Sequence, residues 1–396
     1  MKISPFKVEE WMNRYEAGAL YDLTTTCIKP LTINELLALS DYPSPLTPLP
    51  QGARGTDYSH NSPNSSNWQG DRRINTVFDI PLSYGDITGS ERLKNNIKSL
   101  YNNQDLNNIT VTHGAIGANQ LVFYSLLEKG DEVVSIVPTY QQHYSIPESI
   151  GADIKLYFLK EQNNWLPDLE ELGQVVTSKT KLLCLNNPNN PTGSVIPNWL
   201  LEDIVEFAKQ RNIWILSDEV YRGLNMIGNP YSISIADIYE KGISVGSMSK
   251  TYSLPGLRLG WVCAREDLIN EINHQRQYNT ISVSILDDFF ASLALENKEK
   301  IQERNFNILQ AGMKSFTDWL TQEEFVECVI PNGGTTALVR YKKDMGSREL
   351  CRRLQNRTGV ALLPGETMEM EGYVRVGFCA IALKAALEMF SEFLHQ

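Results

Sequence analysis

Apolar runs rich in β-branched residues alternate with amphipathic stretches between residues 109 and 264. Short apolar runs bounded by turn-forming residues are typical of buried strands, and apolar positions three and four apart are typical of helices. Their alternation predicts a parallel sheet with crossover helices. The predicted strands are 109–112, 132–137, 153–159, 181–185, 213–217, 243–246 and 259–264, and the predicted helices between them include 117–129, 169–177 and 198–211.

The two ends of the chain carry other patterns. Near the N-terminus we expect a helix over 8–19, an extended piece over 21–28, and a helix capped by Thr32, with Glu35 completing a capping box. After residue 267 the pattern is helical to about 319, and then reads strand, strand, helix, strand, strand, helix. We therefore expect an α/β fold, in which a large domain with a mostly parallel seven-stranded sheet flanked by helices is joined by a smaller α+β domain formed by both termini.

A stretch between these parts has a different composition. Residues 43–70 are dominated by Pro, Ser, Asn and Gly. Such a stretch cannot offset its ordering entropy by burial, which favours a flexible insertion; a lid over the active site is the alternative. The expected division is therefore an N-terminal segment (1–40) that joins the small domain, the insertion (41–72), the large domain (73–290) and the small domain (291–396).

Charge and composition exclude several classes of protein. The 396 residues carry a net charge of −11, which argues against nucleic-acid binding. No apolar stretch is long enough to span a bilayer, and the N-terminus lacks the layout of a secretory signal. The six cysteines form no Cys-x-x-Cys pair, so a zinc or redox motif is not indicated and no metal is expected. We expect a cytoplasmic protein with free thiols.

Three segments that follow predicted strands carry candidate chemistry: 186–193, 217–221 and 247–261. In such a sheet, ligands bind beyond the carboxyl ends of the strands. Lys250 lies in a loop of small residues and offers an amine, and Asp218 ends an apolar run where a carboxylate is costly unless it is paired. These are the groups that pyridoxal 5′-phosphate needs: an amine for a Schiff base and proton transfer, and an acid that keeps the pyridine nitrogen protonated. A helix cap is the alternative for Asp218.

Further groups suit the rest of that cofactor. Tyr221 and Asn190 can reach the ring's phenolic oxygen, although a structural role for the tyrosine stays open. Tyr140 follows another predicted strand and could stack on the ring or simply pack. The phosphate needs amides, a hydroxyl and a cation. The candidates are the backbone of Gly114, Ala115 and Ile116, the side chain of Ser247, and that of Arg258.

Arg375 lies between two valines in an alternating strand near the C-terminus. An arginine there is awkward unless it meets an anion, and the α-carboxylate of an amino acid is the natural partner. Arg340 is a rival, but its neighbours are polar and basic, which favours a solvated position.

From about residue 80 to the C-terminus, these motifs resemble the class I/II aminotransferases of the fold type I pyridoxal phosphate enzymes. The shared pieces are Asn190-Pro-Thr-Gly, Ser217-Asp-Glu-Val-Tyr, Ser247-x-x-Lys250, Gly256-Leu-Arg-x-Gly and the late Arg375. The segment that contains Tyr84 is also similar; in the family this tyrosine reaches the phosphate of the neighbouring subunit. The resemblance implies a homodimer that acts on a small-molecule amino acid and transfers its amino group to an oxo acid.

The N-terminal part is more similar to the capreomycidine synthase-like subgroup, on the evidence of residues 11–15, 22–27 and 31–36. In the family this segment lines the substrate side of the pocket, which makes Thr26 and Cys27 candidate contacts. That resemblance implies an alternative reaction, elimination from a hydroxylated arginine and closure of a guanidine ring. A transcription regulator would need an appended basic DNA-binding domain, for which the short acidic N-terminus leaves no room. A non-catalytic paralogue is disfavoured because every cofactor group is present.

Overall fold

The computed structural model describes residues 2–40 and 77–396, so the predicted insertion (41–72) lies wholly outside the described residues. Its largest element is a seven-stranded sheet in the order β2-β8-β7-β6-β5-β3-β4. All strands run parallel except β8, which is antiparallel to both of its neighbours. The strands are β2 (Ile109–His113), β3 (Glu132–Val137), β4 (Asp153–Phe158), β5 (Thr180–Asn186), β6 (Trp214–Asp218), β7 (Gly242–Ser247) and β8 (Leu259–Cys263). The seven predicted strands are confirmed, each to within one residue at either end.

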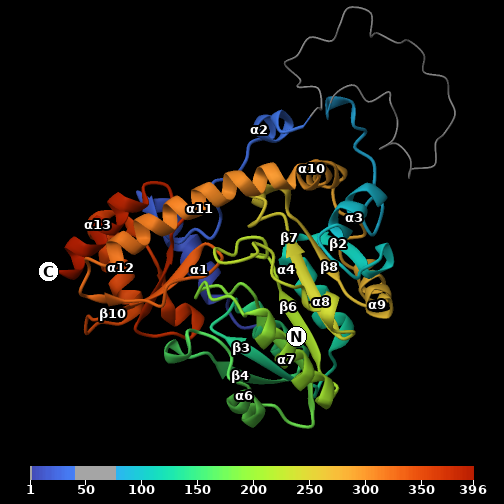
Figure 1. The fold of residues 1–396 in the computed structure, drawn as a ribbon, viewed down its shortest axis with the longest axis horizontal. Coiled ribbons are helices and arrows are strands. Elements are labelled where there is room, and N and C mark those ends of the chain that lie inside the picture. The colour runs from blue at the N-terminus through green and yellow to red at the C-terminus, as the bar shows by residue number, and fades with distance from the viewer. Residues whose placement is uncertain (1, 41–76) are drawn as a thin grey trace, which may run out of the picture.

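Both faces of this sheet are covered by helices, which is why its strands are apolar almost throughout. Along β5, Leu182 and Cys184 pack in one apolar cluster with α4 and α9, while Leu183 and Leu185 pack in another with α7. Figure 1 shows these helices around the sheet. The helices of this part are α3 (Glu91–Lys98), α4 (Gly114–Leu126), α5 (Gln142–Ile150), α6 (Leu169–Val175), α7 (Asn198–Arg211), α8 (Ile235–Ile238), α9 (Glu266–Arg276) and α10 (Ile285–Glu296).

The smaller part is built from both ends of the chain, as expected. A four-stranded sheet has the order β12-β13-β10-β9, and β1 near the N-terminus pairs in parallel with β11 near the C-terminus. The strands are β1 (Tyr21–Asp22), β9 (Val326–Glu327), β10 (Thr336–Tyr341), β11 (Val360–Ala361), β12 (Leu363–Pro364) and β13 (Tyr373–Gly377). The helices of this part are α1 (Lys7–Tyr15), α11 (Lys298–Leu320), α12 (Ser347–Thr358) and α13 (Leu383–Leu394), whereas α2 (Ile33–Ala38) packs through Leu36 and Leu37 in the apolar cluster of the large part. Short 3-10 turns lie at Glu16–Gly18, Val77–Asp79, Leu106–Asn108, Glu161–Asn163, Pro255–Leu257 and Gly365–Met368.

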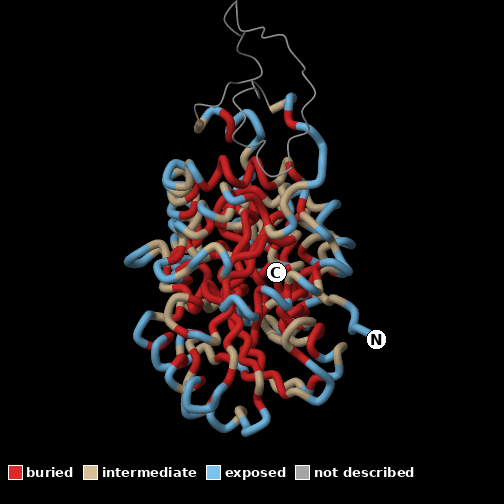
Figure 2. The backbone as a smooth tube through the Cα atoms, turned by 90° about the vertical axis from the view of Figure 1, so that its right-hand side faces the viewer, coloured by how far each residue is buried: buried red, intermediate tan, exposed pale blue. Residues whose placement is uncertain are grey.

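The long helix α11 joins the two parts, running from the large sheet to the small one (Figure 1). Its Ile301 belongs to the apolar cluster of the large part, whereas Leu309 and Phe316 belong to that of the small part. Buried backbone fills the interior of the molecule and exposed backbone forms its rim (Figure 2). The residue boundaries of the two domains stay predictions.

Helix ends differ from expectation in α1, α4 and α6, the last of which ends two residues early. Helix α4 begins at Gly114, three residues before the predicted start, because residues 114–116 already form its first turn. Helix α1 ends at Tyr15 and gives way to the 3-10 turn that ends at Gly18, a residue that disfavours continued α-helix. The capping box of Thr32 and Glu35 is confirmed. No helix within the described ranges combines the length and apolar character needed to cross a membrane.

Candidate active site

A cavity of about 330 Å³ lies at the carboxyl ends of β5, β6 and β7. It is closed by α1, by residues 25–27 and by Arg375 of β13, so both parts of the molecule contribute to it. This is where a ligand is expected in an open parallel sheet. Most of the predicted site residues line it: Thr26, Cys27, Ala115, Ile116, Tyr140, Asn190, Asp218, Tyr221, Ser247, Lys250, Arg258 and Arg375.

Asp218 is the last residue of β6, and it is buried. Its Oδ2 accepts a hydrogen bond of 3.0 Å from Nδ2 of Asn119, and Nε2 of His143 lies 3.4 Å from the same oxygen. Its Oδ1 accepts from the backbone N–H of Val220. The helix-cap alternative fits its neighbour Glu219 instead, which accepts from the N–H of Ile235 at the start of α8. Asp218 is therefore a buried acid at the wall of a cavity, and Asn119 and the backbone of Val220 hold its carboxylate in place.

Lys250 follows β7, and its Nζ donates to Oγ1 of Thr26 at 2.5 Å and to Sγ of Cys27 at 3.3 Å. Burial acts to lower the pKa of this amine, but Tyr221 and Cys27 beside it act in the opposite direction, and the net effect raises the pKa. The Lys250 amine thus contacts the N-terminal segment through Thr26 and Cys27, the two residues that the sequence suggested on the substrate side.

Tyr221 and Asn190 lie where β6 and β5 give way to loops. Burial raises the pKa of the Tyr221 hydroxyl, while the charges of Lys250 and Arg375 oppose that rise. The loop that holds Asn190 is fixed by other asparagines, since Oδ1 of Asn186 accepts from the backbone N–H of Asn190 at 2.7 Å. Asn186 is thus a turn former, as predicted from its Asn-Pro neighbourhood.

An anion cradle is formed where β2 meets α4. Gly114 has φ +66°, and a Cβ there would lie 3.1 Å from the Arg258 guanidinium. A Cβ on Gly260 would lie 2.6 Å from the backbone N of Ala115. Both glycines therefore let the first turn of α4, with its free N–H groups, come close to Arg258. The hydroxyl of Ser247 faces the same cavity.

Arg375 is 2% exposed and reaches the cavity from β13. Its guanidinium donates to Oδ1 of Asn190 at 3.1 Å and to the carbonyl of Thr24 at 2.7 Å, which leaves Nε without a partner. Burial lowers its pKa. The rival Arg340 is exposed and pairs with Glu161 and Glu327, away from the cavity.

Two predicted residues differ from the others: Tyr140 lines the cavity but is bound to the N-terminal segment, and Tyr84 lies outside the cavity. The Tyr140 hydroxyl donates to Oε1 of Glu9 at 2.6 Å, and its ring packs 4.8 Å from that of Phe6, so it is tied to α1. Tyr84 is 78% exposed and does not line the cavity of its own chain.

Sequence reasoning missed several residues of the site. Asn119 lies one helical turn after Ala115, so the spacing i, i+4 places both on one face of α4. That spacing was the available signal. Glu9, Met12 and Glu16 also line the cavity, and they share the spacing of one helical face. Nothing in the sequence showed what that face would meet.

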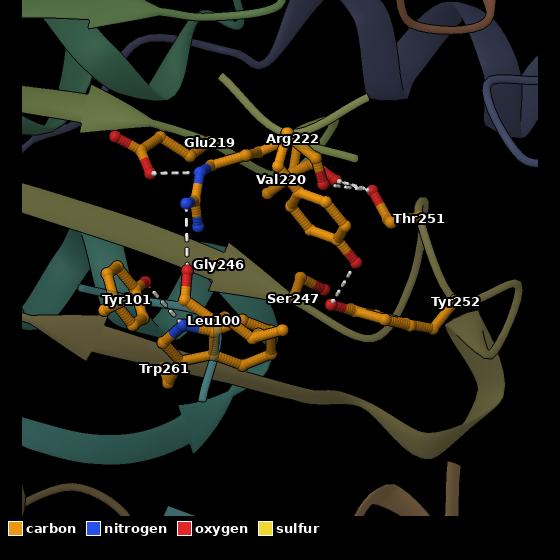
Figure 3. Close-up of a pocket in the computed structure, with 11 residues that line it drawn as sticks. Leu100, Tyr101, Glu219, Val220, Arg222, Gly246, Ser247, Thr251, Tyr252 and Trp261 are labelled. Carbon is orange, nitrogen blue, oxygen red and sulfur yellow. Dashed lines mark hydrogen bonds and ion pairs between the residues drawn. The ribbon is translucent and has the colours of Figure 1, made fainter. Parts of the chain in front are cut away.

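A second, very small cavity adjoins the first, and Val220 and Ser247 line both. Figure 3 shows its buried polar groups, with Glu219 facing Arg222 and Tyr101 beside Trp261. The indole N–H of Trp261 donates to the Tyr101 hydroxyl at 2.9 Å, and the Ser244 hydroxyl donates to Glu219 at 2.8 Å. This network holds the loop that follows β6 in place.

The fold and the site together define a class of protein. The family model for aminotransferase class I and II matches residues 80–393, and the chain belongs to that family. It is thus an enzyme of this class.

Among solved structures, a PLP-dependent aminotransferase from Streptococcus suis 89-1591 is 40% identical, with a TM-score of 0.87 over 100% of this chain and 98% of the other. Capreomycidine synthase from Streptomyces vinaceus is 26% identical over 94% of this chain and 88% of its own. Aspartate aminotransferase from Thermotoga maritima is 30% identical over 72% of this chain and 75% of its own.

Proposed function

We propose that this protein is a pyridoxal 5′-phosphate-dependent aminotransferase that acts on an L-amino acid, with Lys250 as the residue that holds the cofactor. The observation that carries the proposal is that one cavity, in a chain of this family, is lined both by the half-buried amine of Lys250 and by the buried acid Asp218. The Streptococcus suis relative, which is named a PLP-dependent aminotransferase, supports the cofactor.

The residues present fit this cofactor. The glycines at 114 and 260 leave open a cradle that a Cβ would fill, and Ser247 and Arg258 stand at its rim. Asp218 would hold the ring nitrogen, Tyr221 and Asn190 the ring oxygen, and the cradle the phosphate. When bound, the cofactor supplies an aldehyde that bonds to amines and a protonated ring that withdraws electrons from the substrate α-carbon.

The chain's own residues then do four things. Arg375 binds the substrate α-carboxylate, for which its buried guanidinium keeps an unpartnered Nε. Asp218, fixed by Asn119, keeps a proton on the ring nitrogen of the cofactor. The amine of Lys250 takes the proton from the substrate α-carbon and returns it to C4′ of the cofactor. Thr26 and Cys27 contact that amine and close the site from the N-terminal side.

A homodimer is part of the proposal. Tyr84 lies outside its own cavity on an exposed surface, and other large apolar side chains are exposed close to it in sequence or on the neighbouring segment before α10: Leu82, Ile87, Tyr278 and Ile281. An exposed apolar surface of this kind is typical of an interface. A second subunit seated there would explain why Tyr84 points away from the site of its own chain.

Trapping the cofactor tests the proposal. Purified protein supplied with pyridoxal 5′-phosphate, reduced with borohydride and digested is expected to carry the adduct on Lys250 alone. The Lys250→Ala variant, with Lys179→Ala as an exposed control, is expected to carry none. An unlabelled wild-type chain, or an adduct on other lysines, would contradict the assignment.

A second reaction shares the same site, and one observation favours it. The match to capreomycidine synthase covers 94% of this chain and so includes part of the first 40 residues, the region that supplies α1, Thr26 and Cys27 to the cavity. In this candidate the protein expels water from a hydroxylated arginine and closes a guanidine ring. Incubation with hydroxyarginine, and separately with ordinary amino acids plus an oxo acid acceptor, separates the two. A keto acid that forms over many turnovers only with the acceptor supports transfer; a cyclic guanidino amino acid supports cyclisation.

A further inference from the structure

Two carboxylates from the N-terminal segment face the cavity and have no cation of their own. Glu9 of α1 and Glu16 of the following 3-10 turn both line it. Within residues 2–40 and 77–396 neither forms an ion pair, and Lys7 on the same helix is paired with Glu369 instead. The only hydrogen bond to the Glu9 carboxylate within those ranges comes from the neutral hydroxyl of Tyr140.

These carboxylates are crowded as well as unpaired. Burial raises the pKa of Glu16, Asp22 and Glu9 raise it further, and Arg375 opposes the rise. Carboxylates that lie close together gain from a cation that comes between them. Asp22 does not line the cavity, so the carboxylates open to a ligand there are those of Glu9 and Glu16.

The cations of the cavity are already assigned. Among the described residues that line it, these are Lys250, Arg258 and Arg375. The proposed function uses the first for the cofactor aldehyde, the second for its phosphate and the third for the α-carboxylate. In the described part of the chain, no cation of the cavity remains for a second substrate carboxylate, while two carboxylates remain for a substrate cation.

We infer that this cavity selects amino acids whose side chain ends in a cation, a guanidinium or an ammonium group, which Glu9 and Glu16 bind. The inference rests on the proposed function and names its substrate class. Arg375 fixes the α-carboxylate, and the two carboxylates of the N-terminal segment take the cation of the side chain. A side chain that ends in a carboxylate meets repulsion at the same place.

Pairs of isosteric amino acids test the inference. The cofactor-loaded protein is titrated with L-arginine and with L-citrulline, which has nearly the same shape without the charge, and absorbance of the bound cofactor reports binding. L-lysine and L-norleucine form a second pair, which distinguishes ammonium from guanidinium. L-arginine or L-lysine is expected to bind at least about tenfold more tightly than its neutral partner, the effect of a charge-assisted hydrogen bond. L-aspartate is expected to bind most weakly.

Two substitutions locate the effect. Glu9→Gln keeps an oxygen that can accept from Tyr140, so α1 stays in place while the charge is lost. Glu9→Gln combined with Glu16→Gln is expected to bring each charged amino acid to within about threefold of its neutral partner. Glu10→Gln is the matched control: it removes the same charge from the exposed side of the same helix, and the preference is expected to persist.

The outcomes separate this inference from the proposed function. Equal affinities within both pairs, a preference that survives in the double variant, or a spectrum that responds to none of these amino acids would overturn the inference. In each case a borohydride adduct on Lys250 would still support the cofactor assignment. Loss of that adduct from the wild-type chain would count against the proposed function itself.

Discussion

The wall of the cavity made by β5, β6 and β7 with the loops that follow them (the sheet wall) and the wall made by α1 and residues 25–27 (the N-terminal wall) are held in different ways. Asp218 stands at the end of a buried strand with a strand on either side, and Asn119 fixes its carboxylate. Glu9 and Cys27 are only partly buried, on a segment that reaches the site through contacts with distant parts of the chain.

This difference assigns different roles to the two walls. The sheet wall cannot change without disturbing the core, whereas the N-terminal wall can change side chains at little cost in folding. We therefore expect cofactor chemistry to depend on the sheet and substrate choice to depend on α1. The predictions below test that separation.

Asp218→Asn is expected to have the largest effect. The asparagine amide has the shape of the carboxylate but cannot keep the ring nitrogen of the cofactor protonated. Turnover is therefore expected to fall by about a hundredfold to a thousandfold. The cofactor is still expected to be trapped on Lys250. Steady-state kinetics measures the loss, and Asp203→Asn on the exposed face of α7 is the control. Turnover close to that of the wild type would show that this acid does not act on the cofactor.

Trp11→Ala tests the other wall. Trp11 is 5% exposed, and its indole N–H donates to the carbonyl of Leu362 at 3.1 Å, which docks α1 on the small part. Its removal is expected to lower the free energy of unfolding by about 3 kcal/mol. Amino acid binding is expected to weaken while cofactor retention persists. Thermal unfolding and titration measure both, with Trp199→Ala, 62% exposed, as the control. Loss of the cofactor together with the substrate would break the separation.

Arg258→Gln is expected to have a smaller effect. Removal of one charge-assisted contact to the phosphate is expected to weaken cofactor affinity about tenfold to a hundredfold. Equilibrium dialysis measures this loss, and Arg258→Lys is expected to restore part of it. The preference for L-arginine over L-citrulline is expected to stay unchanged, because Arg258 belongs to the sheet wall. A changed preference would show that the two walls are coupled.

The smallest expected effect is a pH dependence of substrate choice. The pKa of Glu16 is raised above its ordinary value of 4.5 by burial, Asp22 and Glu9, against the opposing charge of Arg375. As the pH falls through that raised pKa, Glu16 becomes neutral and attracts a cation less. The preference for L-arginine over L-citrulline is therefore expected to fall by about threefold, with a midpoint above pH 4.5. The Glu16→Gln variant is expected to lack this step; the same step in that variant would assign it to another group.

The sequence predicted the sheet wall well because each strand there is a local pattern. The apolar run before Asp218 is buried on both faces, so its length and end could be read directly from the residue types. The placement of Lys250 in the cavity followed from its position after such a strand.

The N-terminal wall was predicted only in part. The sequence indicated a helix near residue 8 and suggested Thr26 and Cys27, but not Glu9 or Glu16. An amphipathic helix shows which of its faces is apolar, not what that face meets, and the contact that docks α1 joins residues 351 apart in sequence. The early start of α4 was missed for a related reason, since glycines at 114 and 117 look like a turn in the sequence, which does not show that Arg258 lies against Gly114.

The docking of α1 has a practical consequence for handling the protein. The backbone N–H of Lys7 donates to Oε1 of Gln141 at 2.8 Å, which holds the start of this helix next to Tyr140 and Gln142, two residues that line the cavity. A purification tag joined before residue 2 would begin only a few positions from Glu9, which lines the same cavity. Tags and labels therefore belong after Gln396, at the far end of the small part (Figure 1).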